Sequence, residues 1–250
     1  MRDTFDAFEN TGPGLLSGLR PASTRSLPSL RKAVAEMASH YASEGGPISI
    51  KVCTNCFSIA SGVEPTRERF ALLGPIIELM DARRAYGVRT DVTFITFSQH
   101  RAAEIMHRIP ELMLDEEIFR FGNVCGEELH DRVHLVAHTW AMSNQILQAL
   151  VEESAGSPEL GTVRHLVYDG TMMGMYAQIE NEAHFTPFIP GVADYDCPCV
   201  YLYRRDPLFE RLSFGFDKML MPPQMPEYYA LCDAVTLERL LLEHAPREEA

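Results

Sequence analysis

The chain has 250 residues, of which 46% are hydrophobic and 23% charged, which is typical of a folded globular protein rather than a disordered or fibrous one. Its formal net charge of −13 argues against nonspecific binding to DNA or to an anionic membrane surface, since both require a positive field. The acidic residues near the start do not fit a secretory signal, and no stretch is long and apolar enough to cross a bilayer, so we expect a cytoplasmic protein without a membrane partner.

Residues 1–29 open the chain with a segment that, from position 10 onward, is rich in Gly, Pro, Ser and Thr. Such a composition punctuates structure rather than packing into a core, so we expect an extended or flexible N-terminal arm. The length suits one α/β unit. We therefore expect a single catalytic domain over 30–244 and a short tail over 245–250.

Apolar residues recur at helical spacing in some segments and alternate in others. Residues 157–182 are predicted to hold a helix, although 162–168 alone would fit a strand. A strand, a helix and a strand with short joints form a right-handed parallel unit, so we expect a Rossmann-like, largely parallel sheet flanked by helices. The other predicted elements are helices at 30–41, 66–86 (kinked at Gly74-Pro75), 99–108, 111–120, 127–153 and 237–244, and strands at 48–52, 91–97 and 199–203.

The turn after the first predicted strand is the first place where chemistry is expected. In open parallel sheets, ligands bind beyond the carboxyl ends of the strands. This turn begins with Cys53, and a thiol at the start of a helix can have a lowered pKa and act as a nucleophile. A buried, inert cysteine is the competing interpretation. The polar residues of the turn are Cys53, Thr54, Asn55, Cys56 and Ser58.

Two further patterns could bind a metal or carry redox chemistry. Cys53 and Cys56 have the C-x-x-C spacing of zinc knuckles and dithiol centres, and Cys197 and Cys199 could complete such a site. His130, His134 and His138 would line one stripe of the long predicted helix. This stripe lacks the glutamate of a helical protease motif, so a solvated or half-buried face is the better interpretation.

Tyr176 and Glu180 are four residues apart. On a helix they would share a face, where a phenol and a carboxylate could act on one substrate amine or proton. By itself the pair could equally be a surface contact.

Read together, these segments resemble the tRNA-dependent cyclodipeptide synthases, whose catalytic domain is similar to that of class I aminoacyl-tRNA synthetases. In this family a catalytic serine ends a strand, a Tyr-x-x-x-Glu pair follows, and a later strand ends in a catalytic tyrosine. Cys53 stands where the family has its serine, and one residue is missing before Asn55, so Thr54 and Ser58 are also candidates. The matching stretches are Ile50-Lys-Val-Cys-Thr-Asn-Cys-Phe-Ser58, Tyr176-Ala-Gln-Ile-Glu180 with Phe185, and Cys199-Val-Tyr-Leu-Tyr-Arg-Arg-Asp-Pro-Leu208.

The resemblance implies an aminoacyltransferase that makes a cyclic dipeptide from two aminoacyl-tRNAs. Cys53, or a neighbouring hydroxyl, would accept the first aminoacyl group. Tyr176 and Glu180 would hold its ammonium and move protons, and Tyr203 would assist ring closure. No cofactor and no metal is expected, because the esters are already activated. The residues expected to bind the substrate are Asn55, Ser58, Tyr201 and Asp169.

An arginine-using branch of this family, found in fungi, would explain acidic side chains near the site, since Asp169, Asp194 and Asp196 could recognise a guanidinium. Two other functions fit the sequence. One is a zinc-binding or dithiol-redox protein that uses Cys53, Cys56, Cys197 and Cys199. The other is a non-enzymatic acidic interaction module whose helix at 127–153 docks a partner. The scattered basic residues open to a tRNA backbone are Arg83, Arg84, Arg89, Arg101, His107 and Arg108.

Overall fold

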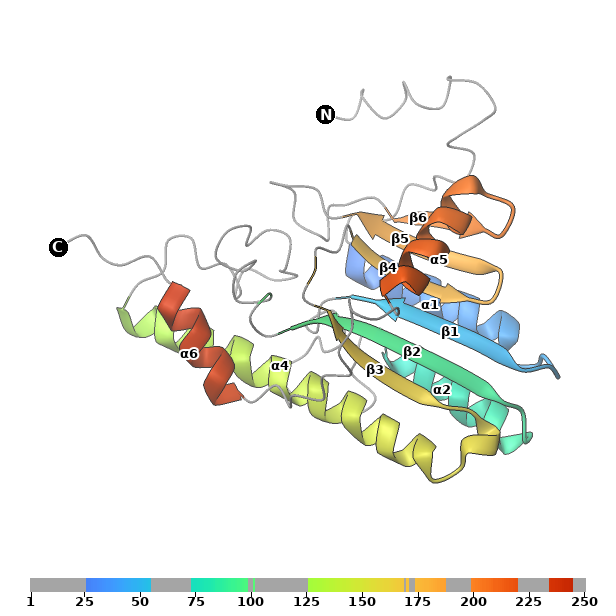
Figure 1. Ribbon diagram of the computed structural model, residues 1–250, viewed down its shortest axis with the longest axis horizontal. Coiled ribbons are helices and arrows are strands. Elements are labelled where there is room, and N and C mark those ends of the chain that lie inside the picture. Colours follow the sequence, from blue (N-terminus) through green and yellow to red (C-terminus); the bar gives the residue numbers. More distant parts are fainter. Residues whose placement is uncertain are drawn as a thin grey trace, which may run out of the picture.

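The computed structural model describes residues 26–54, 73–98, 101, 126–168, 170, 174–187, 199–219 and 234–244. These residues form an α/β structure in which helices pack against one sheet (Figure 1). The helices are α1 (Ser26–Tyr41), α2 (Leu73–Ala85), α4 (Gly126–Ala155), α5 (Pro207–Met219) and α6 (Ala234–His244), with a 3-10 turn at Pro158–Leu160. The strands are β1 (Ile48–Cys53), β2 (Thr90–Phe97), β3 (Val163–Tyr168), β4 (Gly174–Ile179), β5 (Glu182–Pro187) and β6 (Val200–Tyr203).

The sheet is mixed, with the strand order β3-β2-β1-β4-β5-β6. The pairings of β1 with β2 and of β2 with β3 are parallel, which confirms the predicted β1-α2-β2 unit. The pairings β1–β4, β4–β5 and β5–β6 are antiparallel. The predicted α/β class is therefore confirmed, whereas parallel pairing is confined to half of the sheet. A two-residue turn joins β4 to β5, and so short a turn can connect only antiparallel neighbours.

One face of the sheet is covered by α1, α2 and α4. Alternation in β1 turns Ile48, Ile50 and Val52 toward these helices, where they are at most 3% exposed. Met37 of α1 and Leu147 of α4 belong to the same core. Figure 1 shows α5 on the other side of the sheet, over the antiparallel strands.

The segment 157–182 does not form the predicted helix. It contains β3, β4 and the turn to β5, so the strand prediction for 162–168 is confirmed and the helix prediction is wrong. Helical spacing was misleading because every residue of β4 is buried, and its sequence therefore lacks the polar alternation of a half-exposed strand. Glu180, the first residue of the turn after β4, has a φ of 49°, a left-handed conformation suited to a tight hairpin.

Several boundaries and elements differ from the prediction. The first helix begins at Ser26, inside the predicted arm, and residues 1–25 lie outside the described residues. Nothing in the sequence pattern led us to predict α5. The predicted helices at 99–108 and 111–120 lie outside the described residues, apart from Arg101, which is helical.

Arg83 is buried in the structure, although the sequence left it open to a tRNA backbone. Its side chain is 0% exposed and donates to Thr90 Oγ1 at 2.9 Å and to the carbonyls of Tyr41 and Glu44, each at 2.8 Å. It also donates to the carbonyls of Gly46 and Arg89. These hydrogen bonds connect the loop before β1 to the start of β2. The Arg83 guanidinium is therefore buried and engaged, and it cannot reach RNA.

The long helix α4 confirms the prediction for 127–153, and α6 packs against it. His134 and His138 of α4 are exposed and stacked with ring centroids 6.2 Å apart, which confirms the solvated stripe for these two residues. His134 Nδ1 lies 3.2 Å from Glu238 Oε2 of α6. Among the described helices, none is long and apolar enough to cross a membrane.

Candidate active site

The candidate site lies where the order of strands reverses. From β1 the chain adds β2 and then β3 on one side, and it returns to place β4 on the other side of β1. In open α/β sheets, the carboxyl ends of the strands beside such a reversal form the usual ligand crevice. Cys53 is the last residue of β1, and Tyr176 lies near the start of β4. The topology therefore brings two of the predicted catalytic residues together at the carboxyl end of β1.

Cys53 and Tyr176 are directly opposite each other in the β1–β4 pairing. Opposite residues of an antiparallel pair lie on the same face, with Cβ atoms about 5 Å apart. Both side chains are buried, with 3% of Cys53 and 5% of Tyr176 exposed. The thiol and the phenol, which the sequence suggested separately, are neighbours in the fold.

A polar network extends from this pair to α5. Tyr176 Oη donates to Gln178 Oε1 at 2.6 Å. Lys51, two residues before Cys53, lies on the same face and donates from Nζ to Asp217 Oδ1 at 2.7 Å and to Ser213 Oγ at 3.2 Å. Beside these groups Phe216 packs near Tyr176, with ring centroids 6.2 Å apart, and Lys51 Nζ is 5.6 Å from its ring centroid. Helix α5 thus covers Cys53, Tyr176 and Lys51 on this face of the sheet.

Burial sets the protonation of the central pair. It raises the pKa of the Cys53 thiol to about 12. Burial also raises the pKa of the Tyr176 phenol, to which the negative charges of Asp217 and Cys53 add, while a hydrogen bond with Ser213 opposes the shift. Both groups are therefore neutral near pH 7. A neutral thiol can attack a carbonyl only if its proton leaves during the reaction.

Glu180 does not join this pair, contrary to the sequence prediction. Its Oε1 accepts the Ser49 backbone N–H at 2.5 Å, and its own N–H donates to the Ser49 carbonyl at 3.1 Å. Ser49 is at the amino end of β1 and Cys53 at the carboxyl end, about 13 Å away at the rise of a strand. The reason is the strand geometry, because residues four apart in a strand are far more widely separated than in a helix.

Tyr203 and Tyr201 are also placed away from Cys53. In the β5–β6 pairing they lie opposite Glu182 and His184, which alternate with the residues on the face of Tyr176. The two tyrosines therefore share the opposite face, and β6 is three strands from β1, about 14 Å away. Tyr203 is 45% exposed, and Tyr201 packs against His184 with ring centroids 5.2 Å apart. The four predicted catalytic residues do not line one pocket.

The two described members of the predicted cysteine set are likewise apart. Cys199 Sγ lies 3.7 Å from His184 Nδ1 and belongs to the core on the face covered by α1, α2 and α4. Cys53 lies on the other face, and among the described residues neither thiol forms a disulfide. Within the described residues, no group of three or more His, Cys, Asp or Glu side chains could hold a metal.

A second polar group, not predicted from the sequence, occupies the same edge on the opposite face. Thr96 Oγ1 lies 2.8 Å from His165 Nε2, and both side chains are buried. Burial lowers the pKa of His165 to about 4, so the imidazole is neutral near pH 7. Thr54, 1% exposed, donates its backbone N–H to Ile95 O at 3.0 Å, and its Oγ1 has no partner among the described residues.

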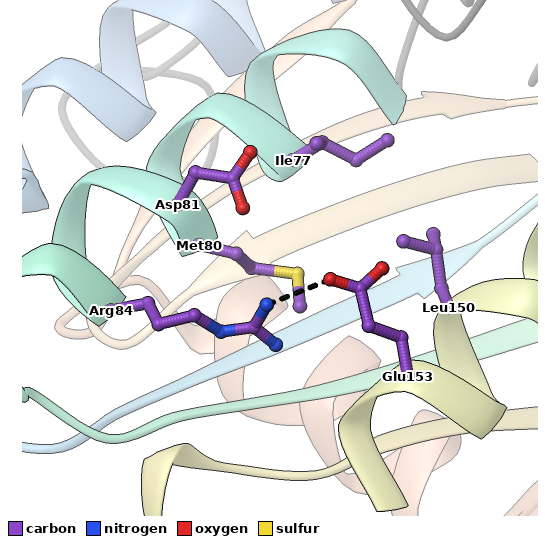
Figure 2. A pocket seen from close by; sticks show the side chains of 6 residues that line it. All are labelled: Ile77, Met80, Asp81, Arg84, Leu150 and Glu153. Atoms are coloured by element: carbon purple, nitrogen blue, oxygen red, sulfur yellow. Dashed lines mark hydrogen bonds and ion pairs between the residues drawn. The ribbon is translucent and has the colours of Figure 1, made fainter. Parts of the chain in front are cut away.

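A hollow between α2 and α4 is shown in Figure 2. It lies on the face of the sheet opposite Cys53 and Tyr176. Arg84 Nη1 and Glu153 Oε1 close it with an ion pair of 2.8 Å, so Arg84 is already engaged. The cavity holds about 10 Å³, the space of one water molecule. It is too small for a substrate.

The side chains beside Cys53 and Tyr176 that the sequence did not suggest are Lys51, Gln178, Ser213 and Asp217. Lys51 interrupts the apolar pattern of β1 between Ile50 and Val52, which is a signal that the sequence does carry. Ser213 and Asp217 gave no such signal in the sequence, because their helix, α5, was not predicted. The remaining site predictions, and the rest of the cysteine and acidic sets, fall on residues outside those described: Asn55, Cys56, Ser58, Asp169, Asp194, Asp196 and Cys197.

No protein-family model, curated protein or solved structure matches this chain. Its function therefore has to be argued from the residues where β1 and β4 pair.

Proposed function

We propose that this protein is an aminoacyltransferase that joins the aminoacyl groups of two aminoacyl-tRNAs into a cyclic dipeptide. One observation carries the proposal: Cys53 and Tyr176, drawn from separate motifs of the resembled family, lie opposite each other at the strand reversal. A nucleophile at the end of the first strand is where this topology places reactive groups. The proposal is revised in one respect, because Glu180 and Tyr203 take no part in the chemistry.

In this reaction, Cys53 Sγ attacks the ester carbonyl of the first aminoacyl-tRNA. A C–S bond forms, the bond to the ribose oxygen breaks, and the thiol proton passes to the departing ribose hydroxyl. Each of the two amide bonds then forms by attack of an amine on a thioester or ester carbonyl. The amine proton leaves with the thiol or with the second ribose hydroxyl, so Cys53 is regenerated. The two esters supply the free energy.

The neighbours of Cys53 have roles that follow from their contacts. Tyr176 is a neutral phenol whose single O–H donates to Gln178, and in the reaction this O–H would turn from Gln178 to the oxygen on which charge develops. Lys51 is a fixed positive charge on the same face, paired with Asp217. It stabilises the negative charge that appears when the thiol proton is lost.

The proposal is tested by expressing the chain in bacteria and measuring cyclic dipeptides in the medium by mass spectrometry. We expect product from the unmodified chain, none from Cys53→Ala, and some from Cys53→Ser, which keeps a nucleophile. Cys199→Ser is the matched control, because Cys199 is also a buried cysteine outside any disulfide but lies on the other face. Equal product from Cys53→Ala and Cys199→Ser would contradict the role of Cys53, and no product from any chain would contradict the proposed reaction.

Tyr176→Phe provides a prediction about rate. The variant keeps the ring next to Phe216 and loses the phenol that donates to Gln178. Loss of one positioned hydrogen-bond donor lowers the rate of such a reaction by roughly 100-fold. The measurement is the initial rate with purified aminoacyl-tRNAs, and Tyr201→Phe, a tyrosine on the other face, should retain the full rate.

A second function is favoured by a specific observation, the raised pKa values of Cys53 and Tyr176. Groups held neutral by burial also suit a protein that binds a ligand near Cys53 and Tyr176 without transforming it, as in the acidic interaction module. This alternative predicts that aminoacyl-tRNA stays charged when incubated with the protein. Release of free tRNA that depends on Cys53 would exclude it.

A further inference from the structure

The outward surface of α5 and the turn before it combine basic and aromatic side chains. This α5 outer surface consists of Arg204, Arg205, Arg211, Phe214 and Lys218, all of them exposed. From Arg211 onward its members are three or four residues apart, so they lie on one side of the helix. In a chain with a formal net charge of −13, four positive charges in one short segment are a local exception.

The acidic residues of this segment are Asp206, Glu210 and Asp217. Glu210 is exposed one turn before Phe214 and offsets one of the four positive charges, whereas the other two carboxylates are engaged within the protein. Asp217 is paired with Lys51 on the inward side of α5, at 2.7 Å. Asp206 Oδ2 accepts the backbone N–H of Tyr203 at 2.7 Å. Arg205 and Arg211 are exposed, and in the part of the chain that the structure describes neither has a carboxylate partner.

Phe214 gives the surface a flat apolar element. It is 62% exposed, and Lys218 Nζ lies 5.1 Å from its ring centroid. An exposed aromatic ring among cations is the arrangement on which an unstacked base can rest while its phosphates meet Arg or Lys. This helix has its own apolar side, which contains Phe209 and Phe216 and is buried, so Phe214 is not needed for the fold.

Helix α5 also connects this surface to the polar network around Lys51 and Tyr176. Ser213 and Asp217 point inward to Lys51, and the exposed Phe214 and Lys218 are their immediate neighbours in sequence. A single-stranded nucleic acid bound along the α5 outer surface would pass within one helix diameter, about 10 Å, of the network around Tyr176.

We propose that the α5 outer surface binds RNA, with the basic residues on the phosphates of a single-stranded segment and Phe214 stacked on a base. The inference rests on the proposed function, in which the substrates are aminoacyl-tRNAs, and assigns them a docking site on an otherwise acidic protein. A lipid surface suits these residues less well. Interfacial helices turn a broad apolar face to the bilayer, whereas the apolar face of α5 is directed at the sheet.

The test measures binding of a fluorescent, uncharged tRNA mixture to the full chain at several salt concentrations. We expect Arg211→Glu to weaken binding about tenfold and to reduce the slope of log K against log salt by about 0.7 for a lost single-strand phosphate contact. Phe214→Ala is expected to weaken binding about tenfold with an unchanged slope, because stacking does not release counterions. Retention of full affinity by both variants would overturn the proposal.

Arg164→Glu is the matched control, since Arg164 is an exposed arginine on β3, at the opposite edge of the sheet. It should bind tRNA as the unmodified chain does, and an equal loss of affinity in Arg164→Glu would overturn the proposal. Unchanged thermal unfolding of the three variants shows that they are folded. A preference for phosphatidylserine vesicles over tRNA, lost in Arg211→Glu, would also overturn it.

The two proposals fail in different ways. If tRNA binds through α5 but no cyclic dipeptide forms, the RNA surface stands and the proposed reaction fails. If cyclic dipeptide forms and Arg211→Glu produces it at the full rate under limiting tRNA, the reaction stands and the RNA surface is overturned.

Discussion

The two halves of the sheet use buried polar side chains differently. In the parallel half, Arg83 and His165 are enclosed by their own secondary structure, and their bonds go to neighbouring backbone and to hydroxyl groups. In the antiparallel half, Lys51 and Tyr176 face α5, whose other side is exposed. The comparison indicates that buried polar groups of the parallel half stabilise the fold, whereas the antiparallel half contains Tyr176 and Lys51 of the proposed site.

The largest effect should come from Arg83→Ala in the parallel half. The change removes the side-chain donor to the Glu44 carbonyl, one of two donors to the Tyr41 carbonyl and the bond to Thr90, and it leaves a cavity, so the free energy of unfolding should fall by about 4 kcal/mol. Urea unfolding measures it. Arg83→Lys keeps a charge without the planar fork and should recover only part of the loss. A loss below about 1 kcal/mol would contradict the stabilising role of Arg83.

His165 should make the stability of the parallel half depend on pH. Because burial holds its pKa at about 4, the unfolded chain, with an ordinary value near 6.5, takes up the proton first as the pH falls. Stability is therefore complete above pH 6.5 and decreases between 6.5 and 4, by about 2 kcal/mol from pH 7.5 to pH 5.

The measurement is the urea midpoint across this range, with His165→Gln and the exposed control His134→Gln. The decrease should become smaller in His165→Gln and stay the same in His134→Gln. Identical pH profiles for the two variants would show that His165 is not the titrating group.

The smallest effect should come from the antiparallel half. Lys51→Met removes the ion pair with Asp217, whose side chain is 48% exposed, so solvent screening limits the loss to about 1 kcal/mol. Thermal unfolding at low and high salt measures it, and the difference should shrink in high salt. Arg84→Met is the matched control, with an expected loss of at most about 0.5 kcal/mol, since both partners of its pair with Glu153 are partly exposed. A loss for Lys51→Met as large as that for Arg83→Ala would remove the distinction between the two halves.

Local pattern was sufficient for much of the fold. The alternation of Ile48, Ile50 and Val52 and the helical spacing along α4 predicted both elements, because each buries one regular face. The pattern was insufficient for β4, in which both faces are buried. It also did not predict that β4 would pair antiparallel with β1, since pairing direction depends on the path of the chain rather than on composition.

The candidate site divides in the same way. The sequence alone determined that a thiol would lie at the carboxyl end of the first strand, because alternation and the turn residues place this end within one residue of Cys53. Only the tertiary structure decided its neighbours. Residues far apart in the chain meet through strand register, which put Tyr176 opposite Cys53, held Glu180 at the other end of β1 and left Tyr203 on the opposite face. Register and face are properties of paired strands, so no single segment of sequence contains them.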